Sequence, residues 1–146
     1  MQDVFMIPCN VKFYDVISHF NKTSTIVWKR SSTMHVGDKV YVYISSPYSE
    51  IKYRCKVINE NVDDDILENN AYAIPKEIMK SFFRSQRVKK NRVYKYVQLE
   101  LEKEYNDGTF PLAELKEHGL GQVQRQERTP KELRAYLERV EDGLEE

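Results

Sequence analysis

The sequence is poor in the residues and segments that mark disulfide-rich, metal-binding and membrane proteins. Only two of its 146 residues are cysteines, Cys9 and Cys55, and no local spacing motif joins them. The three histidines are far apart in the sequence, so they lack the spacing of metal ligands and we expect no metal site. No apolar run is long enough to cross a bilayer and no signal peptide is evident. We therefore expect a soluble cytoplasmic protein without membrane contact, in which both thiols are reduced core residues.

The motifs of the common enzyme families are absent as well. There is no G-x-S-x-G elbow, no Walker loop, no G-x-G-x-x-G and no H-E-x-x-H. The glycine-containing stretch at 119–124 is no phosphate loop, because no helix starts directly after it and no lysine is placed to reach a phosphate. The three aspartates at 63–65 lack the alternate spacing and terminal glutamate of a calcium loop, which favours a solvated acidic loop. We predict no catalytic residue and no cofactor, and expect a protein that is not an enzyme.

The chain has no net charge, yet its charges are unevenly distributed. Its 23 Lys and Arg residues balance 23 Asp and Glu residues. Residues 57–75 contain five carboxylates and no cation, whereas residues 78–99, the basic segment, contain seven cations and no carboxylate. These cations are Lys80, Arg84, Arg87, Lys89, Lys90, Arg92 and Lys95.

The basic segment has two interpretations. A run of charge is usually a solvated surface. Here, however, aromatic residues lie among the cations, and a second basic row occurs on another predicted strand. The aromatic residues are Phe82, Phe83, Tyr94 and Tyr96, and the second row is Lys52, Arg54 and Lys56. If both rows share one face, they would form a positive surface suited to a phosphate backbone.

Residue periodicity predicts an α+β fold. Alternation of apolar and polar residues predicts strands over 3–9, 25–30, 39–45, 51–58 and 92–103. Val40, Val42 and Ile44 should face one side of the third strand and Tyr41, Tyr43 and Ser45 the other. On the fourth strand, Ile51, Tyr53, Cys55 and Val57 should face the core. The HVGD stretch before the third strand should form a turn, with Gly37 at a positive φ. Strands three and four should form an antiparallel hairpin.

Helical spacing predicts four helices on the flanks of this sheet. They cover residues 10–20 with Asn10 as the N-cap, 75–83, 111–119 closed by Gly119, and 129–140 with a capping box of Thr129 and Glu132. The strands do not alternate regularly with these helices, which excludes a doubly wound sheet. We expect one domain over residues 1–146, built as a curved, mostly antiparallel sheet or small barrel.

The only tryptophan, Trp28, stands in the polar stretch WKRSS and also has two interpretations. It could be an ordinary core residue of a short strand. Alternatively it could form the flat wall of a pocket, with Tyr43 or Tyr48 as a second wall and Ser31 and Ser32 as hydrogen-bonding groups. Such a pocket suits a planar heterocycle, which stacks on the rings while its edge is read by hydrogen bonds. Composition does not choose between the two.

Several segments, in this order, resemble the EVE domain of the PUA-like superfamily, which is related to the YTH domain. They are MIPCNVKFYDV, VWKRSS, VGDKVYVYISSP and IKYRCKV, followed by the C-terminal LAELKEHGLGQVQRQERTPKELRAYLE. The resemblance covers nearly the whole chain. It implies a PUA-like curved, mixed and mostly antiparallel β-barrel flanked by helices, acting as a non-catalytic reader of a modified, flipped-out base in DNA or RNA. Such a module could serve a modification-dependent restriction or RNA-regulation system, with a nuclease as a separate partner.

The resemblance also implies a set of binding residues. The base pocket would consist of Asn10, Tyr14, Trp28, Ser31, Tyr43 and Pro47. The nucleic-acid backbone would be held by Arg30 together with Lys80, Arg84, Arg87, Lys89, Lys90 and Arg92. Arg30 departs from the expected pattern, because it places a cation where a neutral polar residue is expected.

Two alternatives belong to other functional classes. One is a small RNA-processing hydrolase of the related ASCH type, for which Lys29 and Glu50 are the candidate catalytic residues nearest in sequence to Trp28 and the tyrosines. The other is a protein-interaction or small-ligand domain whose basic segment docks an acidic partner.

Overall fold

The computed structural model describes residues 3–11, 15–29, 34–60, 62, 96–121 and 127–144. Along the chain these form β1 (Val4–Cys9), α1 (Val16–Lys22), β2 (Thr25–Lys29), β3 (Lys39–Ile44), β4 (Glu50–Asn59), β5 (Tyr96–Glu104), α4 (Leu112–Glu117), β6 (Glu127–Arg128) and α5 (Lys131–Leu144). The predicted helix at 75–83, the acidic loop at 63–65 and the start of the strand predicted at 92–103 lie outside the described residues. No helix in the described ranges is long and apolar enough to span a bilayer.

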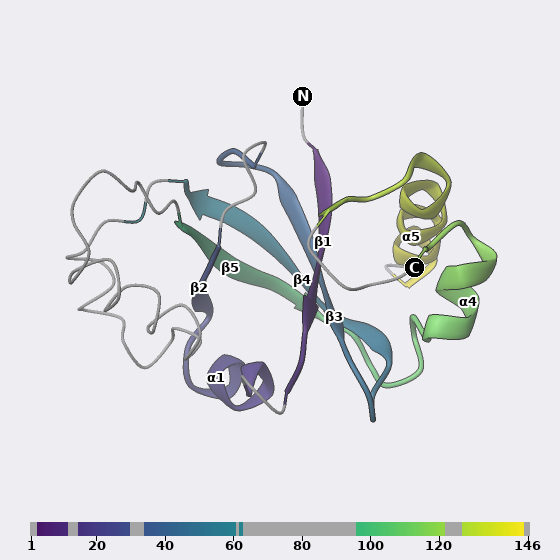
Figure 1. Cartoon of the computed structure of the whole chain (residues 1–146), viewed down its shortest axis with the longest axis horizontal. Coiled ribbons are helices and arrows are strands. Elements are labelled where there is room, and N and C mark those ends of the chain that lie inside the picture. Colours follow the sequence, from purple (N-terminus) through teal and green to yellow (C-terminus); the bar gives the residue numbers. More distant parts are fainter. Residues whose placement is uncertain are drawn as a thin grey trace.

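The strands form one mixed sheet in the order β2-β5-β4-β3-β1-β6 (Figure 1). All neighbouring pairs are antiparallel except β1 and β3, which are parallel. The sheet is twisted, and α4 and α5 lie together on one side of it. Within the described ranges the pairing runs from one edge strand to the other without closing. The predicted α+β architecture, a curved and mostly antiparallel sheet flanked by helices, is confirmed.

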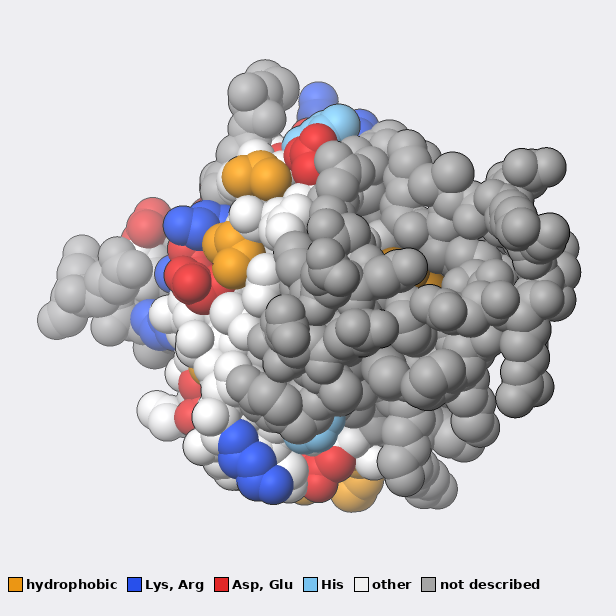
Figure 2. Space-filling view, turned by 90° about the vertical axis from the view of Figure 1, so that its left-hand side faces the viewer, with side chains coloured by type: hydrophobic (Ala, Val, Ile, Leu, Met, Phe, Trp, Pro, Cys, Tyr) orange, Lys and Arg blue, Asp and Glu red, His pale blue; other side chains and the backbone are white. Residues whose placement is uncertain are grey.

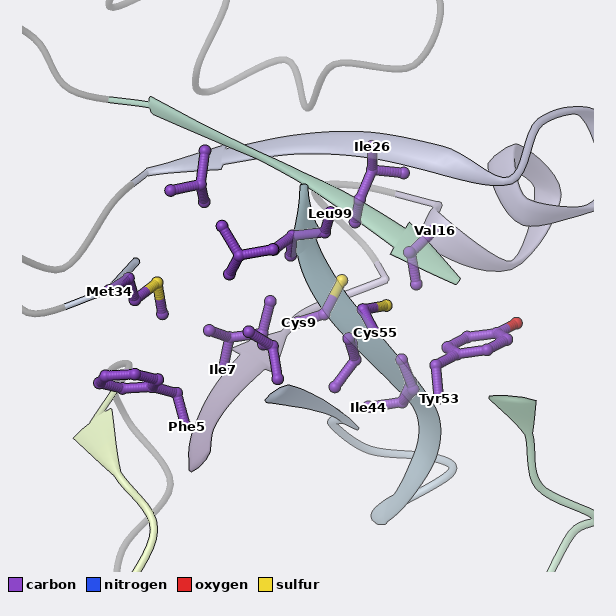
Figure 3. Packing of buried hydrophobic residues seen from close by; sticks show 14 residues of the cluster. Phe5, Ile7, Cys9, Val16, Ile26, Met34, Ile44, Tyr53, Cys55 and Leu99 are labelled. Atoms are coloured by element: carbon purple, nitrogen blue, oxygen red, sulfur yellow. The ribbon is translucent and has the colours of Figure 1, made fainter. Parts of the chain in front are cut away.

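Two hydrophobic clusters cover the two faces of this sheet. The first contains Phe5, Ile7, Val40, Val42, Ile44 and Tyr53 and receives Val16 from α1 (Figure 3). The second contains Val4, Met6, Tyr41 and Tyr43 and receives residues of α4 and α5, among them Leu115, Leu133 and Leu137. The predicted alternation of β3 is therefore confirmed, but its tyrosine side is buried beneath helices. Cys9 and Cys55 are core residues as predicted, and burial raises the pKa of the Cys55 thiol.

A β-bulge changes the faces of β4 at its first residues. Val42 pairs with Tyr53 and Tyr43 with Ile51, so Lys52 is an extra residue on β4. An extra residue reverses the alternation beyond it. Ile51 therefore packs in the second cluster, whereas Tyr53 packs in the first. The prediction that both share one face is wrong, because uninterrupted alternation was assumed.

The helix ends correct two further predictions. The N-cap of α1 is Asp15 and not Asn10: its carboxylate accepts hydrogen bonds from the Ser18 backbone N–H and hydroxyl. These bonds lower the pKa of Asp15. The capping box at α5 is not formed, because the buried Thr129 hydroxyl has no hydrogen-bond partner in the described part of the chain.

The predicted end of α4 at Gly119 is confirmed. Gly119 has φ +101°, and the N–H groups of Gly119 and Leu120 donate to the carbonyls of Lys116 and Leu115. This is the Schellman arrangement, in which a left-handed glycine satisfies the last carbonyls of a helix.

A buried carboxylate, Glu141 of α5, attaches this helix to the sheet. Arg54 Nη1 of β4 lies 3.0 Å from its Oε2. The hydroxyls of Tyr41 and Tyr105 both donate to its Oε1. Burial and the neighbouring Glu141 carboxylate raise the pKa of Tyr41, which keeps this phenol a donor. Because a buried charge is costly unless paired and hydrogen-bonded, these contacts act as one unit.

Removing Arg54 should therefore destabilise the fold more than removing its neighbour Lys52. Arg54→Met leaves Glu141 buried without its cation, and should lower the free energy of unfolding by about 3–5 kcal/mol. Lys52→Met removes a pair with Asp107, whose side chain is 81% exposed, and should cost at most about 1 kcal/mol. Urea unfolding of both variants tests this. Equal losses would contradict the assignment of Glu141 as the attachment of α5.

Candidate functional site

Trp28 lies near the end of edge strand β2. It pairs with Val97 of β5 and is half-buried, with its side chain packed against the first hydrophobic cluster. The two interpretations of this residue are therefore not exclusive. Part of the indole belongs to the core, and part is accessible at the margin of the sheet.

The chain leaves and re-enters the described part of the sheet at this same end. Lys29 pairs with Tyr96, and the Val62 N–H donates to the Tyr96 carbonyl at 3.2 Å. The chain thus leaves the sheet after Lys29 and again after Val62, and it returns at Tyr96. Residues 30–33, which contain RSS, and residues 63–95, which contain the basic cations, are consequently attached at one end of the sheet. We call it the Trp28 end.

A turn at residues 35–38 completes the Trp28 end. The buried Asp38 carboxylate accepts from the backbone N–H groups of His35, at 2.8 Å, and Asp3, at 3.0 Å. The Glu60 carboxylate accepts from the Val36 N–H at 2.8 Å. Gly37 has φ +97°, which only glycine adopts readily, and its N–H donates to the Val57 carbonyl. The predicted turn is confirmed, and it is anchored by two carboxylates.

Two predicted pocket residues, Asn10 and Pro47, lie at the other end of the sheet. β2 runs antiparallel to β5, β5 to β4 and β4 to β3, and β3 is parallel to β1. The last residues of β2 therefore lie at one end of the sheet, and the last residues of β1 and β3 lie at the other end. Asn10, which is exposed, follows β1, and the exposed Pro47 follows β3. The Ser45 N–H donates to the Cys9 carbonyl, which joins these two strand ends.

Tyr43 is not the wall opposite Trp28. Its side chain is only 6% exposed and packs in the second cluster, on the other face of the sheet from Trp28. Burial raises the pKa of its phenol, and Ser49 is its hydrogen-bond partner. The structure thus does not bring Trp28 together with Asn10, Tyr43 and Pro47. Tyr14, Arg30, Ser31, Ser32 and all seven cations of the basic segment lie outside the described residues.

The second basic row on β4 is not a positive surface. Lys52 Nζ lies 3.0 Å from the Asp107 carboxylate, and Arg54 is placed between the carboxylates of Glu102 and Glu141. Figure 2 shows one face of the molecule, on which described Lys and Arg side chains lie near Asp and Glu. The pairing of Lys52 and Arg54 with carboxylates is the reason why these two cations do not form a positive surface.

The candidate catalytic pair Lys29 and Glu50 is also separated. Lys29 ends β2 at the Trp28 end, whereas Glu50 begins β4 at the opposite end. Glu50 is 7% exposed and accepts from the Gly108 N–H at 3.2 Å, which is a structural role. No group of His, Cys, Asp or Glu side chains in the described ranges is placed to hold a metal.

Sequence reasoning missed the part that Asp38 and Glu60 play at the Trp28 end. The HVGD stretch predicts a turn. The sequence does not show, however, that Asp38 is buried and accepts hydrogen bonds from two backbone N–H groups. Glu60 lies 24 positions after Val36 and was counted only as part of an acidic stretch. An aspartate directly after a turn glycine is the one local signal that could have indicated the anchor.

No family model and no curated protein matches this chain. Solved structures do match it. A Ser-to-Ala variant of ZmASCH from Zymomonas mobilis has a TM-score of 0.65 and 13% identity, covering 95% of this chain and 96% of that one. The ASCH structure from the same organism has a TM-score of 0.63 and 12% identity, over 94% of both chains. A hypothetical protein from Leishmania major has a TM-score of 0.66 and 16% identity, over 100% and 98%.

These neighbours correct the suggested family. The prediction of an EVE domain is wrong, because the named structures that match nearly the whole chain are ASCH proteins. Both kinds of domain are PUA-like. The sequence segments on which the resemblance rested therefore did not distinguish the two.

The Asp38 anchor should be needed for the Trp28 end to form. Asp38→Ala leaves two buried backbone N–H groups without their acceptor, and should lower the free energy of unfolding by about 1–3 kcal/mol. Asp38→Asn keeps one carbonyl acceptor and should lose less. Asp107→Ala is the control, because this carboxylate is exposed and should contribute at most about 1 kcal/mol. Urea unfolding followed by Trp28 fluorescence measures all three. A neutral Asp38→Ala would contradict the anchor.

Proposed function

We propose that this chain is an ASCH-type, PUA-like domain that binds single-stranded nucleic acid at the Trp28 end of its sheet. Bases would stack against the accessible part of Trp28, and the cations of the basic segment would hold the phosphates. The observation that carries the proposal is the pairing of Tyr96 with both Lys29 and Val62. It attaches the basic segment to the sheet beside the only tryptophan.

A single strand fits the described surface better than a duplex. Helices that read a duplex enter the major groove with a basic face. α1 and α4 are short, and the cations of α5 alternate with acidic residues, as in the 3.0 Å pair of Arg134 and Glu138. Single strands are bound instead by aromatic side chains that stack on bases beside cations that contact phosphates. Trp28 and the basic segment supply both.

Two finer parts of the earlier expectation are not retained. Recognition of a modified base and recruitment of a partner nuclease were implied by the EVE resemblance. Both lose their basis when the structural neighbours are ASCH proteins. The proposal is therefore limited to stacking of a base and contact with phosphates.

Trp28 allows a direct test, because it is the only tryptophan and its fluorescence reports on this site alone. Titration of the wild type with single-stranded RNA should quench it, and fluorescence anisotropy of a labelled RNA measures the affinity of the variants that lack the tryptophan. Trp28→Leu should weaken binding about 5- to 150-fold, which corresponds to about 1–3 kcal/mol of stacking on one base. Trp28→Phe keeps an aromatic face and should lose less. Phe20→Leu is the matched control, since Phe20 also packs half-buried against the first cluster. A loss as large for Phe20→Leu would mean that Trp28 acts only through packing.

The basic segment gives a second, electrostatic test. Binding should weaken with salt, with a slope of about −0.7 per neutralised phosphate on a single strand. Replacing Lys89 and Lys90 by Ala should reduce the slope by about 1.4 and weaken binding at every salt concentration. Replacing Lys116 and Lys131 by Ala removes the same charge from the exposed surface of α4 and α5. Fluorescence anisotropy at several salt concentrations measures both. Equal effects of the two pairs would refute the assigned phosphate contacts.

An ASCH-like RNA-processing hydrolase is the second candidate. The ASCH structures that match this chain support it, although Lys29 and Glu50 lie at opposite ends of the sheet. For a binding module, RNA incubated with excess protein should be recovered intact. Turnover by the wild type that is lost in both Lys29→Arg and Lys29→Ala would support the hydrolase in place of the binding module.

A further inference from the structure

One large apolar side chain at the Trp28 end is exposed without a packing reason. The large hydrophobic residues that stand clear of the core in the described ranges are Val36, 57% exposed, and Tyr48, 43% exposed. They lie at opposite ends of the sheet, because Val36 precedes β3 and Tyr48 follows it. Val36 is thus at the end to which we assign the ligand, and Tyr48 is not.

The exposure of Val36 does not come from a loose loop. Its own N–H donates to Glu60, and the flanking residues His35 and Gly37 donate to Asp38 and to the Val57 carbonyl. The Asp38 N–H donates back to the His35 carbonyl at 3.0 Å. Consecutive backbone groups are therefore all fixed, while the Val36 side chain points outward. A rigid turn that presents an apolar side chain loses little conformational entropy when a ligand contacts it.

The turn contains the carboxylate of Asp38 and is bonded to that of Glu60. Because both carboxylates accept hydrogen bonds within the fold, the turn suits an anionic ligand better than its composition suggests. Asp38 is buried under two N–H donors. Glu60 is occupied by the Val36 N–H, and His35 Nδ1 lies 3.5 Å from its Oε2. The exposed side chains of residues 35–38 are those of His35, 62% exposed, and Val36. The turn thus presents an imidazole and an isopropyl group to solvent.

The strand order and the register give the distance between this turn and Trp28. β2 and β3 are separated in the sheet by β5 and β4, so they are three strand spacings apart, about 14 Å. Val57, to which Gly37 is bonded, pairs with Leu99, and Leu99 is two residues from Val97, the partner of Trp28. Both features therefore lie at the same level of the sheet.

From these observations we infer that the His35–Val36 turn forms a second wall of the nucleic-acid site. Val36 would pack against a base or ribose of a nucleotide two or more positions along the strand from the one stacked on Trp28, and His35 would donate a hydrogen bond to its phosphate or base. This inference rests on the proposed function, because it deepens the same site. It adds the requirement that the ligand extend over more than one nucleotide.

The test uses single-stranded RNAs of increasing length, from about 4 to about 16 nucleotides, the range that single-strand-binding domains cover. Affinity of the wild-type chain should rise over this range. Val36→Asp places a carboxylate where the longer strands pass, and should weaken their binding about tenfold or more. Tyr48→Asp introduces the same charge at the opposite end and should change binding less than about twofold. His35→Ala should weaken binding of the longer strands several-fold.

Two readouts separate this inference from loss of fold and from failure of the proposed function. Quenching of Trp28 by the shortest RNA should be the same in Val36→Asp as in the wild type, and thermal unfolding of both Asp variants should be unchanged because both positions are exposed. If the wild type binds RNA but Val36→Asp binds it as Tyr48→Asp does, the second wall is refuted and the proposed function stands. If the wild type binds no RNA at any length, both are refuted.

Discussion

The buried ion pair between Arg54 and Glu141 is the interaction on which the arrangement of this protein depends. A carboxylate in the core is tolerated only with a cation and further donors, and Tyr41 and Tyr105 complete that set. The pair links the middle of the sheet to the last helix, so it determines which face α5 covers. It also pairs Arg54, one of the three cations of β4 that were predicted to form a positive row, with a carboxylate of the core.

The two ends of the sheet are not equivalent. At the Asn10 end, the strand ends are joined by short connections and tied by the Cys9 carbonyl and by Glu50, which accepts from Gly108. At the Trp28 end, the chain leaves the sheet before residues 30–33 and again before residues 63–95, and it re-enters the sheet after each. These two stretches contain the polar residues that follow Trp28 and the cations of the basic segment. Loops placed by a rigid scaffold are where proteins usually hold their binding residues. The strand register attaches both of these segments beside Trp28, and this makes the Trp28 end the better candidate for a binding site. The composition of any one segment does not show it.

Much of the fold could be predicted from the sequence, because its signals are local. Alternation in β3 and the glycine that ends α4 depend on neighbouring residues only. The errors share a different cause. The bulge at Lys52 arises from pairing with β3. The N-cap of α1 is Asp15 and not Asn10, because the helix begins at Val16. The partner of Tyr41 lies 100 positions away, and the pocket of Trp28 and Tyr43 failed because their two strands present these side chains on different faces.

The polar setting of Trp28 follows from its position at the end of an edge strand. An indole in the middle of β2 would need apolar neighbours on both sides, whereas at this end it can pack against the first cluster and still reach the margin of the sheet. β2 ends at Lys29, directly after the tryptophan, so the strand does not require apolar residues beyond this point. The same position explains why a turn fixed by Asp38 and Glu60 matters. A half-buried ring offers one stacking surface, and discrimination between ligands requires a second fixed surface at a set distance from it.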